Sequence, residues 1–178
     1  TIDSIPMNLS SLCNEVVSLF AIKARQRGLV LDYHYTESLS PYVKGDPVRL
    51  KQVMVNLVNN AIKFTREGGR VTIDVKHMQD NPCLDNKDCD QTKGSNDSRL
   101  DFAIDDKNST TIHQGMTLCI EVTDTGVGIK SESLEAIFDA YDQANKYTHR
   151  LYGGTGLGLS VCKSLVELMG GYIEVDSV

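Results

Sequence analysis

Three times along this chain, a helical pattern of apolar residues ends near glycine and an alternating pattern follows at once. The helical patterns cover residues 9–27, 46–65 and 157–169. Strands are predicted by alternation over residues 29–35, 71–75, 116–122 and 172–175, with a short helix near 132–138. Helices with one apolar face must bury that face, and a sheet provides a surface against which they can pack. We therefore expect an α/β fold, a two-layer sandwich with helices on one face of a mixed sheet.

Residues 77–115 interrupt this pattern. The segment contains eight Asp and no Glu against four Lys or Arg, and it is poor in apolar residues. Without it, 16 acidic and 14 basic residues remain of 24 and 18, so −4 of the net charge of −6 lies there. It has no strand period beyond the short stretch Leu-Asp-Phe-Ala-Ile. We predict an inserted, largely solvated acidic loop.

Composition excludes several classes of protein. A net charge of −6 argues against a broad surface for nucleic acid or for an anionic membrane. No apolar run approaches the roughly 20 residues that cross a bilayer, and no leader peptide is visible. Five cysteines at irregular spacing indicate a reducing compartment, so we expect a cytoplasmic domain. Cys83 and Cys89, flanked by His77 and His113, match no common zinc spacing and are interpreted as solvated thiols.

The helix after residue 45 has a clear start and a clear core face. Asp46 is typical of an N-cap, and Pro47 is typical of the first helical position. Apolar residues at helical spacing predict the buried face: Leu50, Val53, Leu57, Ala61 and Phe64.

A polar stripe runs beside that core face. Asn56, Asn60 and Lys63 stand at i, i+4 and i+7, and Asn59 is close enough in angle that spacing alone does not exclude it. Asn is a poor helix former, so three within five residues of a helix interior are unexpected. The stripe is either an ordinary solvated face or a site where amide oxygens complete a Mg²⁺ shell and the lysine meets phosphate.

Two glycine-rich motifs follow. Asp124-Thr125-Gly126-Val127-Gly128-Ile129 comes directly after a predicted strand. Its carboxylate can accept a hydrogen bond from an exocyclic amine, and its glycines permit close approach of a flat ligand. Residues 153–159, Gly-Gly-Thr-Gly-Leu-Gly-Leu, open a helix whose N–H groups can cradle an anion. The latter is neither a Walker motif nor the dinucleotide fingerprint, and the former alone is more often a turn.

In combination the motifs are specific. The ordered series NLVNNAIKFT, DTGVGI, YGGTGLGLS and CKSLVELMGG resembles the ATP-binding catalytic domain of sensor histidine kinases, with its N, G1 and G2 boxes. The resemblance covers nearly the whole chain and implies the Bergerat-type α/β sandwich, with ATP and Mg²⁺ as ligands. The segments around these boxes look most like those of eukaryotic hybrid kinases, plant-type ones included, which often carry long insertions.

The resemblance also implies roles for individual residues. Asn60 would bind Mg²⁺, with Asn56 supporting it, and Lys63 would contact phosphate, so Asn60 and Lys63 would be the catalytic residues. Phe64 would lie near the adenine, and Asp124 would receive the adenine amine. The base pocket would be shaped by Gly126, Gly128 and Ile129. The phosphates would be wrapped by Gly154, Thr155, Gly156, Leu157, Gly158 and Leu159.

Residues 130–153 would form the ATP lid. Lys146, His149 and Arg150 either supply it with positive charge or belong to a solvated loop. Phe138 lies in the region of the family's F box, or is a core residue. Ala140 and Tyr141 replace the expected proline and second phenylalanine, which puts the packing of the lid in question.

The implied activity is transfer of the ATP γ-phosphoryl group to a histidine on an adjacent dimerisation domain, followed by a receiver domain or response regulator. None of the four histidines has the acceptor context, so those helices are expected in a longer protein, as is a final segment after Val178. One alternative is a degenerate ATP-binding signalling module. Another is an ATP hydrolase related to DNA gyrase and MutL, but the residue one turn before Asn60 is Asn56 rather than Glu, and an amide is no general base.

Overall fold

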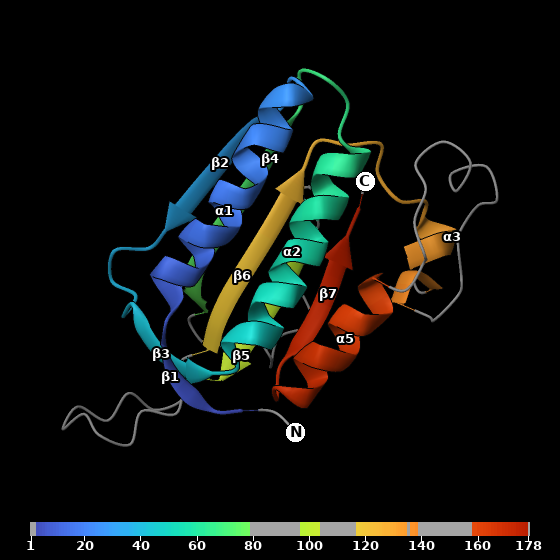
Figure 1. Cartoon of the computed structure of the whole chain (residues 1–178). Coiled ribbons are helices and arrows are strands. Elements are labelled where there is room, and N and C mark those ends of the chain that lie inside the picture. Colours follow the sequence, from blue (N-terminus) through green and yellow to red (C-terminus); the bar gives the residue numbers. More distant parts are fainter. Residues whose placement is uncertain (1–2, 79–96, 104–116, 135, 139–157, 178) are drawn as a thin grey trace, which may run out of the picture.

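The computed structural model describes residues 3–78, 97–103, 117–134, 136–138 and 158–177. Its main sheet has five strands in the order β2-β4-β6-β5-β7 (Figure 1). The strands are β2 (Val30–Tyr35), β4 (Arg70–Met78), β5 (Asp97–Ala103), β6 (Thr117–Asp124) and β7 (Tyr172–Asp176). Strand β2 pairs in parallel with β4, and the other pairs are antiparallel, so the expected mixed sheet is confirmed.

Three longer helices cover one face of this sheet, as Figure 1 shows. They are α1 (Leu9–Gln26), α2 (Pro47–Phe64) and α5 (Gly158–Leu168). The core lies between the two layers, where α2 contributes Leu50, Met54 and Ile62, and the sheet contributes Ile73 and Ile120. The two-layer α/β sandwich is therefore confirmed. Within the described part of the chain, no helix is long and apolar enough to span a bilayer.

Helix α2 starts as the sequence predicts. The Asp46 carboxylate Oδ1 accepts hydrogen bonds from the backbone N–H groups of Arg49 at 3.0 Å and Val48 at 3.1 Å, and Pro47 is the first helical residue. The N–H of Arg49 is the main cause that holds the pKa of Asp46 below its ordinary value. Such a cap satisfies N–H groups that the helix itself leaves without a partner.

The acidic segment differs from the prediction in two places, one at its start and one in its interior. Strand β4 continues through His77 to Met78, and β5 lies inside residues 77–115. The loop prediction is therefore wrong for these positions, and the rest of the segment lies outside the described residues. Strand β5 pairs on both sides, with Leu100 opposite Ile120 of β6 and opposite Ile173 of β7. Both partners are distant in sequence, so local alternation carried too little information to reveal the strand.

A small second sheet was also not predicted. Strand β1 (Ile5–Asn8) pairs antiparallel with β3 (Tyr42–Gly45). Asn8 then caps α1, since its side-chain oxygen accepts from the Ser11 N–H at 2.9 Å. These four-residue strands precede α1 and α2, and each is too short to show a period in the sequence.

Candidate functional site

A backbone hydrogen bond joins the carboxyl end of α2 to the turn after β6, and two further hydrogen bonds join that turn to the start of β4. The N–H of Val127 donates to the Phe64 carbonyl at 3.3 Å. Beside it, the Thr125 N–H donates to the Arg70 carbonyl at 3.1 Å, and the Arg70 N–H donates to Thr125 Oγ1 at 2.9 Å. Figure 1 shows α2 and β6 ending at the same edge of the molecule. The first two sequence motifs therefore meet.

Asp124, the last residue of β6, is half-buried at this junction. Its Oδ1 accepts the N–H of Gly126 at 2.7 Å. Burial raises the pKa of the carboxyl group, while hydrogen bonds with the Gly126 N–H and the Thr65 side chain act in the opposite direction. One carboxylate oxygen is thus held by the turn, and the group retains further capacity to accept hydrogen bonds.

Glycine is required at two positions of the turn. A Cβ on Gly126 would lie 2.4 Å from Asp124 Oδ1 and 2.7 Å from the Phe64 carbonyl oxygen. Gly128 has a φ of +69°, which L side chains rarely adopt. The next residue, Ile129, donates its N–H to Ser177 Oγ at 2.6 Å. This bond ties the end of the turn to the residue that follows β7.

The asparagine side chains of α2 have different neighbours in the structure. Asn59 Oδ1 accepts from Lys23 Nζ of α1 at 2.6 Å. Burial raises the pKa of the Cys162 thiol of α5 to about 11, and the side chain of Asn56 acts in the opposite direction, so Asn56 lies on the side of α2 that faces α5. Asn60 stands one turn after Asn56, on the same face, and both are half-buried. The ambiguity over Asn59 is resolved by its contact with Lys23, which directs it away from that face.

Lys63 and Phe64 end α2. Lys63 Nζ lies 4.8 Å from the centroid of the Phe64 ring, a cation–π geometry. Burial lowers the pKa of Lys63. Phe64 is half-buried, unlike Leu50, Val53, Leu57 and Ala61, which are buried as predicted. Both side chains therefore stand at the margin of the core, beside the Asp124 turn.

The third motif is described in part. Gly158 and Leu159 begin α5, as expected, and both are half-buried. The other phosphate-wrapping candidates, Gly154 to Leu157, lie outside the described residues, as do Ala140, Tyr141, Lys146, His149 and Arg150. The predicted short helix appears as α3 (Ser131–Leu134) and a 3₁₀ turn, η2 (Ala136–Phe138).

The cysteines and histidines provide no metal centre in the described part of the chain. There, no cluster of three or more His, Cys, Asp or Glu side chains could hold an ion. Cys13 and Cys162 are free thiols, and both are buried, as is Cys119. Cys83, Cys89 and His113 lie outside the described residues.

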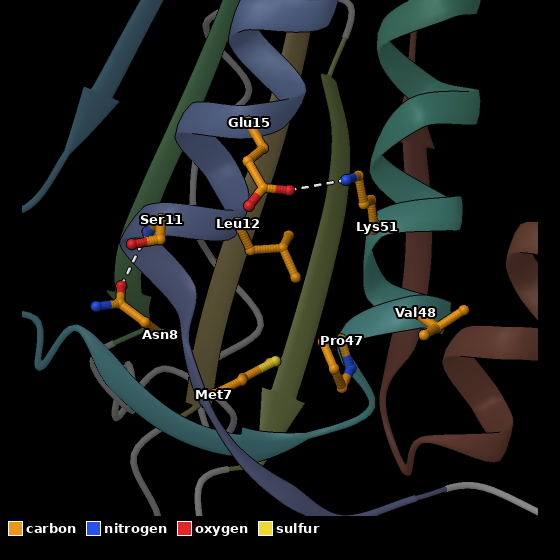
Figure 2. A pocket seen from close by; sticks show the side chains of 8 residues that line it. All are labelled: Met7, Asn8, Ser11, Leu12, Glu15, Pro47, Val48 and Lys51. Carbon is orange, nitrogen blue, oxygen red and sulfur yellow. Dashed lines mark hydrogen bonds and ion pairs between the residues drawn. The ribbon is translucent and has the colours of Figure 1, made fainter.

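A hollow of about 350 Å³ lies at the opposite end of α2. Figure 2 shows it between the amino-terminal parts of α1 and α2, where Lys51 and Glu15 form an ion pair at 2.8 Å. Its lining residues are Met7, Asn8, Ser11, Leu12, Glu15, Pro47, Val48 and Lys51. None of them belongs to the predicted nucleotide site, so this hollow is not part of that site.

Sequence reasoning missed three residues that contact the site. Ser177 Oγ accepts the Ile129 N–H, Thr65 is among the groups that act on the pKa of Asp124, and Cys162 has its pKa affected by Asn56. Thr65 directly follows the Asn-rich helix, and that position is the one feature of the sequence that could have identified it as part of the site. The other two are distant from the motifs they contact, so no local pattern could identify them.

Comparison with known proteins identifies one family. Residues 45–178 match the family described as "Histidine kinase-, DNA gyrase B-, and HSP90-like ATPase". Probable histidine kinase 4 of Oryza sativa subsp. japonica is 33% identical over 99% of this chain and 21% of its own length. The sensor protein GacS of Pseudomonas syringae pv. syringae is 36% identical over 99% of this chain and 16% of its own length. The chain spans about a fifth of the curated relatives it matches.

Solved structures share the fold. The catalytic domain of histidine kinase ThkA has a TM-score of 0.62 and 23% identity, and the match covers 99% of this chain and 95% of that one. Full-length ShkA in complex with AMPPNP has a TM-score of 0.65 and 22% identity, and the match covers 100% of this chain and 31% of that one. The α/β sandwich with helices on one face of a mixed sheet is the fold of these domains.

Proposed function

The chain belongs to the family of histidine kinase-, DNA gyrase B-, and HSP90-like ATPases, and from this premise we propose that it is the ATP-binding catalytic domain of a sensor histidine kinase. Its reaction is transfer of the γ-phosphoryl group of ATP to a histidine on an adjacent helical segment. In that transfer a bond forms between the imidazole nitrogen and the γ-phosphorus while the bond to the leaving ADP oxygen breaks.

One observation carries the proposal. The helix bearing Asn56, Asn60 and Lys63 ends against the turn bearing Asp124, through the bond between the Val127 N–H and the Phe64 carbonyl. Side chains suited to binding phosphate and a side chain suited to binding a nucleobase therefore lie at the same junction of α2 and the turn after β6. Such positioning is the main contribution that a protein makes to phosphoryl transfer.

Asp124 is the proposed receptor of the adenine amine. Its Oδ1 is occupied by the Gly126 N–H, so the carboxylate is oriented by its own turn and retains capacity for a further donor. An adenine amino group donates, whereas the corresponding group of guanine is a carbonyl oxygen that a carboxylate repels. Gly126 and Gly128 support this role because side chains there would collide with the turn or strain it.

Asn60 is the proposed protein ligand of Mg²⁺, with Asn56 beside it. The donor chemistry fits, because Mg²⁺ prefers oxygen ligands and takes few of them from protein when phosphates supply the others. When bound, the ion would neutralise charge on the phosphates. Lys63 would meet the same phosphates, and the start of α5 at Gly158 and Leu159 would present its N–H groups to them.

The residue at position 56 favours transfer over hydrolysis. An ATP hydrolase of this type needs a base for water one turn before the metal ligand, and Asn56 cannot act as one. The Asn56 side chain instead acts to lower the pKa of the Cys162 thiol, against the larger effect of burial. The alternative of a degenerate ATP-binding module predicts nucleotide binding without phosphoryl transfer, and a phosphotransfer assay distinguishes the two.

The partners of this domain follow from the proposed reaction. They are the helical segment that carries the acceptor histidine and, after it, a receiver domain or response regulator. ThkA has been solved in complex with the response regulator TrrA, which supports a partner of that class. We assign residues 130–153 to an ATP lid by their position between the two glycine motifs. The free thiols of Cys13 and Cys162 support a reducing, cytoplasmic setting.

Labelling with γ-³²P-ATP tests the proposal. The purified chain alone should bind ATP but give no acid-labile, base-stable phosphoprotein, because its four histidines lack the acceptor context. Adding the helical segment of the parent protein should produce label on that segment. This labelling should be weak, because separation removes the effective concentration that a covalent tether supplies.

Three outcomes contradict the proposal. ATP binding without label on the helical segment supports the degenerate module. Rapid release of free phosphate by the chain alone supports a hydrolase. Stoichiometric label on His34, His77, His113 or His149 would move the acceptor into this chain.

A further inference from the structure

Strand β6 ends at Asp124, one residue short of the first residue of β4. The last register pair of these two strands joins Asp124 to Val71, so the next pair would join Thr125 to Arg70. A hydrogen-bonded pair of an antiparallel sheet exchanges two backbone hydrogen bonds. Here the Thr125 N–H donates to the Arg70 carbonyl at 3.1 Å, but the Arg70 N–H donates at 2.9 Å to Thr125 Oγ1. The side chain of Thr125 thus replaces its own backbone carbonyl as the acceptor.

This replacement decides the direction of the next peptide group. In a trans peptide, the carbonyl of one residue and the N–H of the next point in opposite directions, so a Thr125 carbonyl directed at β4 would hold the Gly126 N–H in the plane of the sheet, pointing away from β4. Instead, that N–H donates to Asp124 Oδ1 at 2.7 Å. Asp124 lies two residues after the buried Val122, so its side chain is on the face of the sheet that the helices cover. The Thr125 hydroxyl therefore allows the chain to leave the sheet and turn back over the Asp124 carboxylate.

The backbone of Arg70, which supplies the donor, is itself restrained. The carbonyl of the preceding Gly69 accepts the Val30 N–H of β2 at 3.0 Å, and the Arg70 guanidinium forms an ion pair with Asp32 of the same strand. A Cβ on Gly69 would lie 2.9 Å from Thr125 Oγ1, so the hydroxyl packs closely against this position. The turn after β6 is therefore anchored through one hydroxyl group to a residue that both β2 and β4 hold in place.

We propose that Thr125 is a positioning residue for base recognition. Its hydroxyl group ends β6 at Asp124 and directs the Gly126 N–H to one carboxylate oxygen, so that the remaining acceptor capacity of the carboxylate faces the amino group of adenine. Thr125 thereby sets the preference for a purine that carries this amino group, without touching the base. This inference rests on the proposed role of Asp124 in ATP binding and adds the residue that orients its carboxylate.

Three variants separate the hydroxyl group from the shape and the place of the side chain. Thr125→Val keeps the branched shape and removes the hydroxyl, whereas Thr125→Ser keeps the hydroxyl. Thr72→Val is the matched control, because Thr72 lies inside β4, opposite Thr123 and away from the turn. Calorimetry with Mg²⁺-ATP and with the Mg²⁺ complex of purine riboside triphosphate, which lacks the amino group, measures what each variant loses.

Thr125→Val should weaken ATP about fivefold, a loss of the size of one ordinary hydrogen bond, and should weaken the purine analogue less than about twofold. Thr125→Ser and Thr72→Val should keep the ratio of the two dissociation constants within about twofold of that of the unaltered chain. In the nucleotide-free chain, the NMR resonance of the Gly126 amide proton reports its hydrogen bond to the carboxylate. This resonance should move upfield in Thr125→Val and stay in place in the other two variants.

The ratio of the two affinities makes the test independent of stability. If Thr125→Val weakens both nucleotides equally, or lowers only the melting temperature, Thr125 is structural and the inference is wrong. An unmoved Gly126 resonance in that variant, or an equal loss of the ratio in Thr72→Val, also overturns it. Should the unaltered chain bind the two nucleotides equally, the role of Asp124 fails before any variant is made, and the inference fails with it.

Discussion

Gly126→Ala is the sharpest test of the junction between α2 and β6. The added Cβ would lie 2.4 Å from Asp124 Oδ1 and 2.7 Å from the Phe64 carbonyl oxygen. A comfortable C···O contact is about 3.3 Å, so the overlaps are roughly 0.9 Å and 0.6 Å. The carboxylate can rotate, but the carbonyl is backbone at the end of α2 and accepts the Val127 N–H. Rotation alone therefore cannot relieve the clash.

The expected cost follows from overpacking. Forcing a methyl group into such a site destabilises a protein by about 1–3 kcal/mol. For a chain of this size, that cost lowers the melting temperature by roughly 2–12 °C. Nucleotide affinity should fall as well, because displacing Asp124 Oδ1 from the Gly126 N–H disturbs the proposed base receptor.

Gly45→Ala is the matched control. It is the same substitution, and its Cβ would meet only the end of the flexible Met7 side chain, at 3.1 Å. Alanine lowers the conformational entropy of the unfolded chain. This variant should therefore be as stable as the original chain or up to about 1 kcal/mol more stable. Urea unfolding of both variants, with and without Mg²⁺-ATP, measures the two effects. Equal stability of Gly126→Ala and Gly45→Ala would refute the reasoning, since it would mean that the junction yields at little cost.

Further predictions concern the rest of the site and the acidic segment. Asn60→Ala should abolish most of the Mg²⁺ dependence of ATP affinity in calorimetry, because it removes the proposed protein oxygen ligand; an unchanged dependence would reject that assignment. Asp124→Asn should weaken ATP more than GTP, and equal losses would contradict the base-recognition role. Because burial raises the pKa of Asp124 when the protein folds, the folded state holds that proton more tightly than the unfolded state. The same variant should therefore be more stable than the original chain at pH 7. It should lose that advantage as the pH falls toward about 4, where the carboxyl group is protonated in both states, which denaturation at several pH values can check. Deleting residues 81–94 should keep nucleotide binding within a few-fold, since loop-closure cost changes slowly with length. Deleting residues 81–110 should destabilise the chain, because it removes β5 from between β6 and β7; thermal unfolding of the two deletions compares them, and equal melting temperatures would show that β5 contributes nothing.

Much of the fold was predictable from the sequence because its signals are local. The apolar period of α2, its Asp46 cap and the alternation of β2 and β4 depend on residues a few positions apart. The same holds for the turn after β6, where Gly128 needs a positive φ. The order of the three motifs also sufficed to identify the family that the comparisons show.

Contacts between distant segments could be decided only by the tertiary structure. A helical wheel gives the angle between Asn56 and Asn59, but not that one faces α5 and the other meets Lys23 of α1. Strand β5 has a weak period of its own and is defined by two neighbours that come later in the chain. In the sequence Phe64 is only the end of a helix, and the fold places its carbonyl against the Val127 N–H. Local periodicity determines which face of an element is buried, whereas the partner on that face depends on long-range packing, which no short stretch of sequence encodes.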